Sequence, residues 1–333
     1  MKSIWLLALL LIAPLTASAQ DGPSYGPELE GFDYPYPVKY YDFQSQGKPL
    51  RMAYLDVAAE RTANGRTVVL MHGKNFCAAS WEGTIKALTK AGYRVIAPDQ
   101  VGFCKSSKPE AYQFSFHQLA ANTRALLDQA GAAKVTVMGH SMGGMLATRF
   151  ALLYPDQTEQ LVLANPIGLE DWKVKGVPYQ SVDKWYEGEL KTSAERIRDY
   201  QKNTYYVGEW RPEFDKWVQM QAGMYRGAGK AAVAWNSALT YDMIYTQPVF
   251  YEFEHLKMPV LMLIGEKDNT AIGKALAPAE LRKELGVYSR LGKEVAARIP
   301  NATLVSFEDL GHSPQIQAPE RFHEALIKGL AKS

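Results

Sequence analysis

The sequence has little of what metal-binding, nucleotide-binding and nucleic-acid-binding proteins require. It contains two cysteines in 333 residues, no H-E-x-x-H motif and no cysteine–histidine cluster at metal-ligand spacing. Neither G-x-G-x-x-G nor a P-loop follows a predicted strand. No run of lysine or arginine occurs, and the net charge is only +2. We therefore expect no metal, no cofactor and no nucleic-acid partner, and a small molecule as the substrate.

Residues 1–19 have the pattern of a secretory signal peptide. Lys2 precedes an apolar stretch, and the small residues Ala17 and Ala19 form an A-x-A cleavage site. A buried N-terminal helix would instead need polar residues on one face, and residues 5–12 contain none. We expect cleavage after Ala19, export to the periplasm or the extracellular space, and no membrane anchor in the mature chain.

Strands and helices alternate through most of the chain. After an irregular lead over residues 20–37 come two β-rich segments, and then apolar runs that are each followed by a segment with helical spacing. This alternation predicts βαβ crossovers, and therefore an α/β fold with a mostly parallel sheet of eight-stranded type and helices on both faces. The predicted strands span residues 38–43, 50–58, 67–73, 94–99, 134–139, 160–166, 259–268 and 302–312.

The alternation stops over residues 168–255, which are helix-like and hold five of the seven tryptophans. A helical insertion between two strands of one sheet predicts a cap, and it leaves residues 38–167 and 256–333 for the core. Aromatic residues at helical spacing usually form a cap's own core. They can also line a pocket for an apolar or aromatic group, for which the candidates are Tyr205, Tyr206 and Trp210.

Ser141 is the candidate nucleophile. It is the serine of a G-x-S-x-G motif over residues 139–143, which follows a predicted strand and precedes a predicted helix. The glycines allow a tight strand-to-helix turn that exposes the serine side chain above the sheet edge. The alternative is an ordinary turn serine, which would need no partner histidine.

Of six histidines, His312 is the candidate base. It lies in a loop just after the last predicted strand, at the sheet edge where open parallel sheets build their sites. The alternative for His312 is a solvated loop histidine. We expect His72 and His140 to brace turns, and the other three to be surface or capping residues: His117, His255 and His323.

An acidic side chain must orient the imidazole, and three residues compete for this role. Glu266 and Asp268 follow the strand after the cap, and Asp268 lies further along the loop that could reach His312. Asp309 is only three residues from His312. The sequence around these residues favours Asp268 without excluding the others.

A serine that attacks an acyl group also needs donors for the oxyanion. The backbone N–H of Met142, directly after the serine, is one candidate. The second is expected from the loop after the strand at residues 67–73, where either Lys74 or Asn75 would donate through its amide. The spacing from His72 to Trp81 favours Lys74.

These segments together resemble the α/β-hydrolase superfamily in its lidded branch. The resemblance covers residues 38–330 and rests on the motifs "LMHG", "APDQVGFCKSS", "GHSMGG", "GEKD" and "GHSP" in that order. It implies a catalytic triad in the chain order Ser141, Asp268, His312, which supports Asp268 as the acid. Haloalkane dehalogenases and epoxide hydrolases resemble this sequence elsewhere, but they carry an aspartate where Ser141 stands.

The sequence departs from this family at two places. Cys104 stands where the loop D-x-x-G-x-G-x-S usually has glycine, and "HGKNFC" lacks the glycine-rich run typical of carbon–carbon bond hydrolases. The resemblance also implies that the loops carrying Cys77 and Cys104 lie side by side. In an exported chain this favours a disulfide between them over two buried free thiols.

Three hypotheses for function follow from this resemblance. The first is an exported serine hydrolase that acts on an ester-type bond, as a carboxylesterase or lactonase does. A second is a carbon–carbon bond hydrolase of vinylogous diketones with the same three residues. The last is a ligand-binding receptor or pseudoenzyme on the same scaffold.

Overall fold

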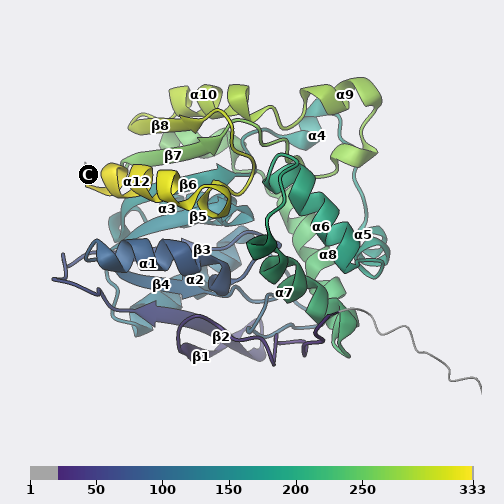
Figure 1. The fold of residues 1–333 in the computed structure, drawn as a ribbon, viewed down its shortest axis with the longest axis horizontal. Coiled ribbons are helices and arrows are strands. Elements are labelled where there is room, and N and C mark those ends of the chain that lie inside the picture. Colours follow the sequence, from purple (N-terminus) through teal and green to yellow (C-terminus); the bar gives the residue numbers. More distant parts are fainter. Residues whose placement is uncertain (1–21, 332–333) are drawn as a thin grey trace, which may run out of the picture.

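The computed structural model describes residues 22–331, and the predicted signal peptide lies outside these residues. Eight strands form one sheet in the order β1-β2-β4-β3-β5-β6-β7-β8 (Figure 1). The pairs β1–β2 and β2–β4 are antiparallel and the other pairs are parallel, so the predicted α/β fold is confirmed. The strands are β1 (Val38–Ser45), β2 (Lys48–Val57), β3 (Thr67–Met71), β4 (Arg94–Pro98), β5 (Val135–Ser141), β6 (Thr158–Pro166), β7 (Val260–Gly265) and β8 (Ala302–Phe307).

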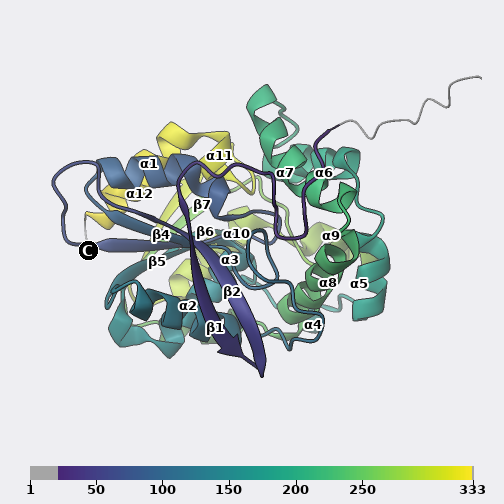
Figure 2. The same cartoon turned by 90° about the horizontal axis from the view of Figure 1, so that it is seen from below.

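Helices cover both faces of this sheet, which explains why its central strands are continuously apolar. Every residue of β3, β5 and β7 is buried. Because side chains alternate along a strand, Val68 and Leu70 contact one layer of helices, and Val69 and Met71 contact the other. Figure 2 shows α1 and α12 on one side of the sheet and α2 on the other. The flanking helices are α1 (Glu82–Lys90), α2 (Phe116–Gln129), α3 (Met142–Leu153), α10 (Tyr288–Arg298), α11 (Pro314–Gln317) and α12 (Pro319–Leu330).

Residues 168–255, called the cap below, lie between β6 and β7 and contain helices and loops but no strand. They gather at one end of the sheet, as Figure 1 shows. The cap contains α4 (Trp172–Lys175), α5 (Val182–Glu189), α6 (Ala194–Tyr200), the π-helix η3 (Gln201–Tyr205), η4 (Pro212–Phe214), α7 (Asp215–Arg226), α8 (Lys230–Thr246) and η5 (Phe250–His255). Short elements elsewhere are η1 (Ala78–Trp81), η2 (Pro155–Gln157), η6 (Lys274–Leu276) and α9 (Ala279–Glu284).

The segment before β1 joins the cap to the core. The Tyr25 N–H donates to the Gly223 carbonyl in α7 (2.9 Å), and Lys105 of the core donates to the Leu29 carbonyl (3.0 Å). Over the part of the chain that the structure describes, none of the helices combines the length and the apolar character that a membrane crossing requires.

Candidate active site

Ser141 lies on a strained turn at the carboxyl end of β5. Its backbone has φ 56° and ψ −123°, and α3 begins at the next residue. Two glycines make this turn sterically feasible. A Cβ on Gly139 would lie 2.0 Å from the Gly143 carbonyl oxygen, and a Cβ on Gly143 would lie 2.1 Å from the Met71 carbonyl oxygen. The strand-to-helix context predicted for Ser141 is therefore present.

His312 and Asp268 reach Ser141 from two separate loops. His312 Nε2 lies 2.8 Å from Ser141 Oγ, and His312 Nδ1 lies 2.6 Å from Asp268 Oδ2. All three side chains are buried. A carboxylate that accepts from Nδ1–H leaves Nε2 free to accept the serine proton. The three residues thus form one hydrogen-bonded chain at the carboxyl edge of the sheet.

Neighbouring polar groups hold the Asp268 carboxylate in place. The backbone N–H and the hydroxyl of Thr270 donate to Asp268 Oδ1 (2.8 and 2.7 Å). Asn165, at the end of β6 with φ 38°, donates to Asp268 Oδ2 (3.0 Å). Sequence reasoning did not find Asn165, although an asparagine at a strand end is a signal for such a left-handed backbone position.

The two rival acids lie elsewhere. Asp309 is exposed and accepts from the Arg321 guanidinium (2.7 and 2.9 Å). Glu266 pairs at 3.5 Å with Lys293 on the surface side of α10. Only Asp268 of the three candidates is bonded to His312 within the described residues.

The loop that carries His312 is held from both the core and the cap. His140 Nε2 lies 2.7 Å from the His312 carbonyl oxygen, and burial lowers the pKa of His140 well below its usual value, so its ring stays neutral. From the cap, the Thr204 carbonyl in η3 accepts from the His312 N–H (3.2 Å). Gln317 accepts from the Gly311 N–H (2.8 Å) and donates to the Tyr206 carbonyl (3.3 Å).

The loop after β3 passes directly beside the nucleophile. A Cβ on Gly73 would lie 3.0 Å from Ser141 Cβ. Among residues 22–331, the backbone N–H groups of Lys74 and Asn75 have no hydrogen-bond acceptor. Met142 is the first residue of α3, so its N–H has no acceptor within the helix either. These are the donors that a negatively charged oxygen next to Ser141 could use.

Of the three aromatic residues predicted to line a pocket, only Tyr205 touches His312. Its ring centre lies 5.0 Å from the imidazole, and its hydroxyl accepts from Asn75 Nδ2 (2.9 Å). Tyr206 instead stacks on Phe214 at 3.8 Å, and Trp210 packs against both. These two side chains therefore belong to the packing of the cap. Helical spacing in the sequence indicates that a side chain is buried, but it does not indicate which residue it packs against.

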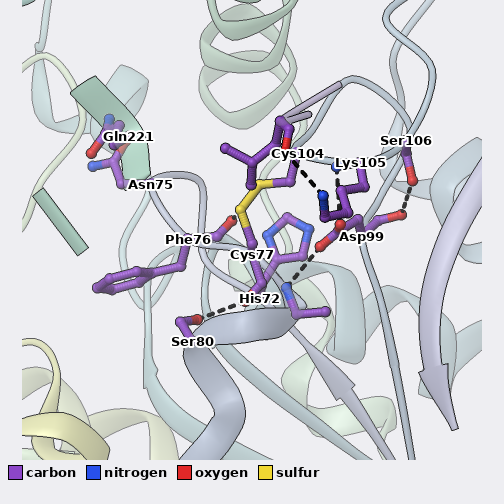
Figure 3. Close-up of a disulfide and its surroundings, with 12 residues drawn as sticks. His72, Asn75, Phe76, Cys77, Ser80, Asp99, Cys104, Lys105, Ser106 and Gln221 are labelled. Atoms are coloured by element: carbon purple, nitrogen blue, oxygen red, sulfur yellow. Dashed lines mark hydrogen bonds between the residues drawn. A yellow bond between two sulfur atoms is a disulfide. The ribbon is translucent and has the colours of Figure 1, made fainter. Parts of the chain in front are cut away.

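Cys77 and Cys104 form a disulfide that joins the loop after β3 to the loop after β4 (Figure 3). Asp99 lies beside it and accepts from the N–H groups of Ala78 and Lys105 (2.7 and 3.1 Å). Together these three side chains are a cluster of metal-binding residue types. Because both sulfurs are bonded to each other, the cluster offers no thiolate ligand.

This strand order, with a serine on the turn after β5 and a helical insertion after β6, defines the α/β-hydrolase class. A family model described as the α/β hydrolase fold matches residues 66–319, and the chain therefore belongs to that family.

Two relatives are similar to most of the chain. A crystal structure of a probable hydrolytic enzyme from Pseudomonas aeruginosa PAO1 is 72% identical, with a TM-score of 0.92, over 93% of this chain and 99% of that chain. The AB hydrolase superfamily protein YfhM of Bacillus subtilis (strain 168) is 38% identical over 294 residues, which are 83% of this chain and 94% of that protein.

Other curated relatives match over less than half of their own length. The 2-hydroxy-6-oxo-6-phenylhexa-2,4-dienoate hydrolase of Burkholderia cepacia is 32% identical over 40% of this chain and 48% of that protein. Haloalkane dehalogenases and an epoxide hydrolase also match in part. The names of these relatives refer to different substrate classes, namely dienoates, haloalkanes and epoxides.

Proposed function

We propose that this chain is a serine hydrolase that cleaves an ester-type acyl bond, as a carboxylesterase or lactonase does. The observation that carries this proposal is the buried chain of hydrogen bonds from Ser141 Oγ through His312 to Asp268, at 2.8 and 2.6 Å. A serine hydroxyl becomes a nucleophile when a neutral imidazole accepts its proton, and this geometry provides that acceptor.

The reaction would proceed in two halves. Ser141 Oγ attacks the acyl carbon while its proton moves to His312 Nε2, and Asp268 stabilises the imidazolium. The oxygen of the tetrahedral intermediate accepts from the N–H groups of Met142 and Lys74. His312 then protonates the departing alcohol, which leaves an acyl group on Ser141. A water molecule, deprotonated by His312, then attacks this acyl-enzyme, and His312 returns the proton to Ser141 Oγ as the acid leaves.

The activities named for the dehalogenase and epoxide hydrolase relatives do not suit this chain. Displacement at an alkyl carbon needs a carboxylate nucleophile, whereas the turn between β5 and α3 of this chain holds Ser141. A serine oxygen with a histidine base is suited to an acyl carbon.

Cleavage of a carbon–carbon bond is the second candidate. It is favoured by the partial similarity to the Burkholderia cepacia dienoate hydrolase and by a similar match to a dienedioate hydrolase of Comamonas testosteroni. Against it stands the loop "HGKNFC", which has one glycine before Lys74 and none after it. Activity on a vinylogous 1,5-diketone without activity on simple esters would favour this candidate.

A panel of p-nitrophenyl esters, lactones and dienoates tests the proposal. We expect ester or lactone hydrolysis, and a fall of kcat by about 10³-fold or more in Ser141→Ala, because the three residues act as a unit. The exposed serine of β8, in Ser306→Ala, is the matched control and should retain full activity. Rates of Ser141→Ala within tenfold of the wild type would exclude Ser141 as the nucleophile.

We also infer that the protein is exported. The pattern of residues 1–19 supports this, and so does a disulfide between the only two cysteines of the chain, because disulfides persist in oxidising compartments. N-terminal sequencing of the protein from a periplasmic or culture fraction should begin at Gln20.

A further inference from the structure

A groove lies between the cap and the loop after β7. It consists of two cavities of about 580 and about 290 Å³. The two cavities share five lining residues and therefore lie side by side; we call the pair the cap groove. The shared residues are Gln180, Trp185, Arg196, Tyr200 and Tyr241.

The cap groove is lined by neighbours of the candidate catalytic residues. Thr270, which lines the groove, also donates to Asp268. Asn75, which lines the other end, belongs to the loop that passes Ser141. Between them, the ring of Tyr200 contacts Tyr205, which in turn contacts His312, at centre distances of 5.3 and 5.0 Å. The side chains of Tyr200 and Tyr205 therefore separate the groove from the His312 ring.

Positive charge dominates the lining of the cap groove. Three basic residues line it, Arg196, Lys274 and Arg282, against one acidic residue, Glu189. The whole chain is nearly balanced, with 37 basic and 35 acidic residues. The excess of basic residues in the groove is therefore local.

Within the described residues Glu189 forms no ion pair with Arg196 or Arg282, and its hydrogen-bond partners are other side chains of the cap. The hydroxyls of Tyr225 and Ser237 both donate to Glu189 Oε2, and Ser237 in turn accepts from Lys74 Nζ (2.5 Å). Lys74 Nζ also lies 3.5 Å from the centre of the Tyr241 ring, whose other face Trp185 covers at 4.3 Å. The Lys74 ammonium therefore lies against Tyr241, one of the side chains that line the groove.

The two arginines are without a carboxylate partner in the described part of the chain. Arg196 donates to the Lys191 carbonyl (3.0 Å), and neither Arg196 nor Arg282 forms an ion pair there. Nine other arginines do form ion pairs with aspartate or glutamate. A guanidinium can bind a carboxylate through two parallel N–H groups, and Arg196 and Arg282 have this capacity unused.

We propose that the cap groove selects substrates that carry a carboxylate, with Arg196 and Arg282 as the residues that recognise it. The proposal rests on the proposed ester hydrolysis and names its substrate class. An anionic group would be attracted into the groove by its basic lining and held at the arginines, while the ester carbonyl reaches Ser141. Attraction of this kind raises kcat/KM and weakens as salt is added.

Isosteric pairs of substrates test this selection. In the first pair, the anionic mono-p-nitrophenyl glutarate is compared with its neutral glutaramide analogue, so the charge lies on the acyl part. In the second pair, the anionic 4-acetoxybenzoate is compared with the neutral 4-acetoxybenzamide, so the charge lies on the alcohol part. At low salt we expect kcat/KM about tenfold higher for the anionic member of at least one pair. The preference should shrink towards unity at high salt.

The double variant Arg196→Gln/Arg282→Gln should lose this preference through an increase in KM for the anionic ester, while the neutral ester keeps its rate. Arg61→Gln, at an exposed arginine outside the groove, is the control and should change neither. An equal effect on both members of each pair, or no preference in the wild type, would overturn the proposal.

A failure of the proposed function would look different. In that case no ester would be hydrolysed, yet binding of benzoate against benzamide, followed by tryptophan fluorescence, would still report on the groove. Tighter binding of benzoate in the wild type, lost in the double variant, would support an anion-selective groove. Equal binding of both ligands would refute it.

Discussion

The surroundings of Asp268 and Asp309 predict that removing the first carboxylate has a large effect on catalysis and removing the second has almost none. Asp268 is buried and has four hydrogen bonds, two from Thr270 and one each from Asn165 and His312. Asp309 is close to His312 in sequence, but it is exposed and paired with Arg321. An exposed ion pair contributes little to stability and cannot orient a ring that it does not contact.

We therefore expect Asp268→Ala to lower kcat by about 10³- to 10⁴-fold, because the imidazole loses the carboxylate that fixes its tautomer. Asp309→Ala is the matched control and should keep kcat within about twofold. Steady-state kinetics on one activated ester would measure both. A variant of Asp309 that is far more damaged than the variant of Asp268 would contradict the assignment of the acid.

At the scale of elements, the disulfide couples two loops, of which only one carries a proposed oxyanion donor. Cys77 belongs to the loop that carries Lys74, and Cys104 to the loop after β4. Cys104 has φ 46°, a left-handed backbone conformation that favours glycine. A cysteine at this position therefore strains the backbone and destabilises the fold. We expect the bond to Cys77 to offset this destabilisation.

Reduction of the disulfide should lower kcat before it unfolds the protein, because the loop that presents the Lys74 amide becomes free to move. The bridge spans a sequence separation of 27 residues and should contribute about 3 kcal/mol to the free energy of unfolding. Urea unfolding and ester kinetics with and without reductant would measure both effects.

Two double variants separate the covalent link from the backbone strain. Cys77→Ala/Cys104→Ser lacks the bridge and keeps the strain, whereas Cys77→Ala/Cys104→Gly lacks both. We expect the glycine variant to be the more stable of the two by about 1 kcal/mol. Full activity of the reduced wild-type protein would show that the bridge has no catalytic role.

For the whole molecule, buried titratable groups determine how stability depends on pH. Burial lowers the pKa of His323 to about 4, whereas an unfolded histidine titrates near 6.5. Burial also lowers the pKa of Lys74 and Lys108 to about 8, and it raises the pKa of Tyr205, Tyr225 and other tyrosines of the cap.

These shifts predict that stability is greatest near pH 10. Below pH 6.5 the histidines of the unfolded chain bind protons that the same buried histidines do not bind in the folded chain. The free energy of unfolding therefore decreases as the pH falls. From pH 8 to about 10 the folded lysines have lost protons that the unfolded ones keep, so stability rises. Above about pH 10 the unfolded tyrosines ionise and the buried ones do not, so stability falls again.

His323→Gln isolates one part of this dependence. From pH 7 to pH 5 the wild type should lose about 1 to 2 kcal/mol more stability than the variant, because the variant has no histidine to protonate in the unfolded chain. Urea unfolding at a series of pH values would measure the difference. Parallel curves for the two proteins would show that His323 is not the group responsible.

The sequence by itself determined the order of strands and helices along the chain and selected Ser141 and His312 as candidates, whereas the resemblance to the α/β-hydrolase superfamily favoured Asp268 over Glu266 and Asp309. The physical reason is local. A continuous apolar run marks a strand buried on both faces, and the residue after it marks the strand's end. Parallel strands bring their carboxyl ends to one edge, so residues 127 and 44 positions apart, as Ser141, Asp268 and His312 are, meet there.

Only the tertiary structure decided which side chains surround these residues. Asn165 reaches Asp268 from another strand, and His140 and the cap's Thr204 hold the loop of His312. Periodicity predicted that the cap's aromatic residues form its core or line a pocket, but not that Tyr206 would stack on Phe214 while Tyr200 faced the groove. Such contacts join segments far apart in the chain, and their geometry depends on how whole elements pack, which no local pattern encodes.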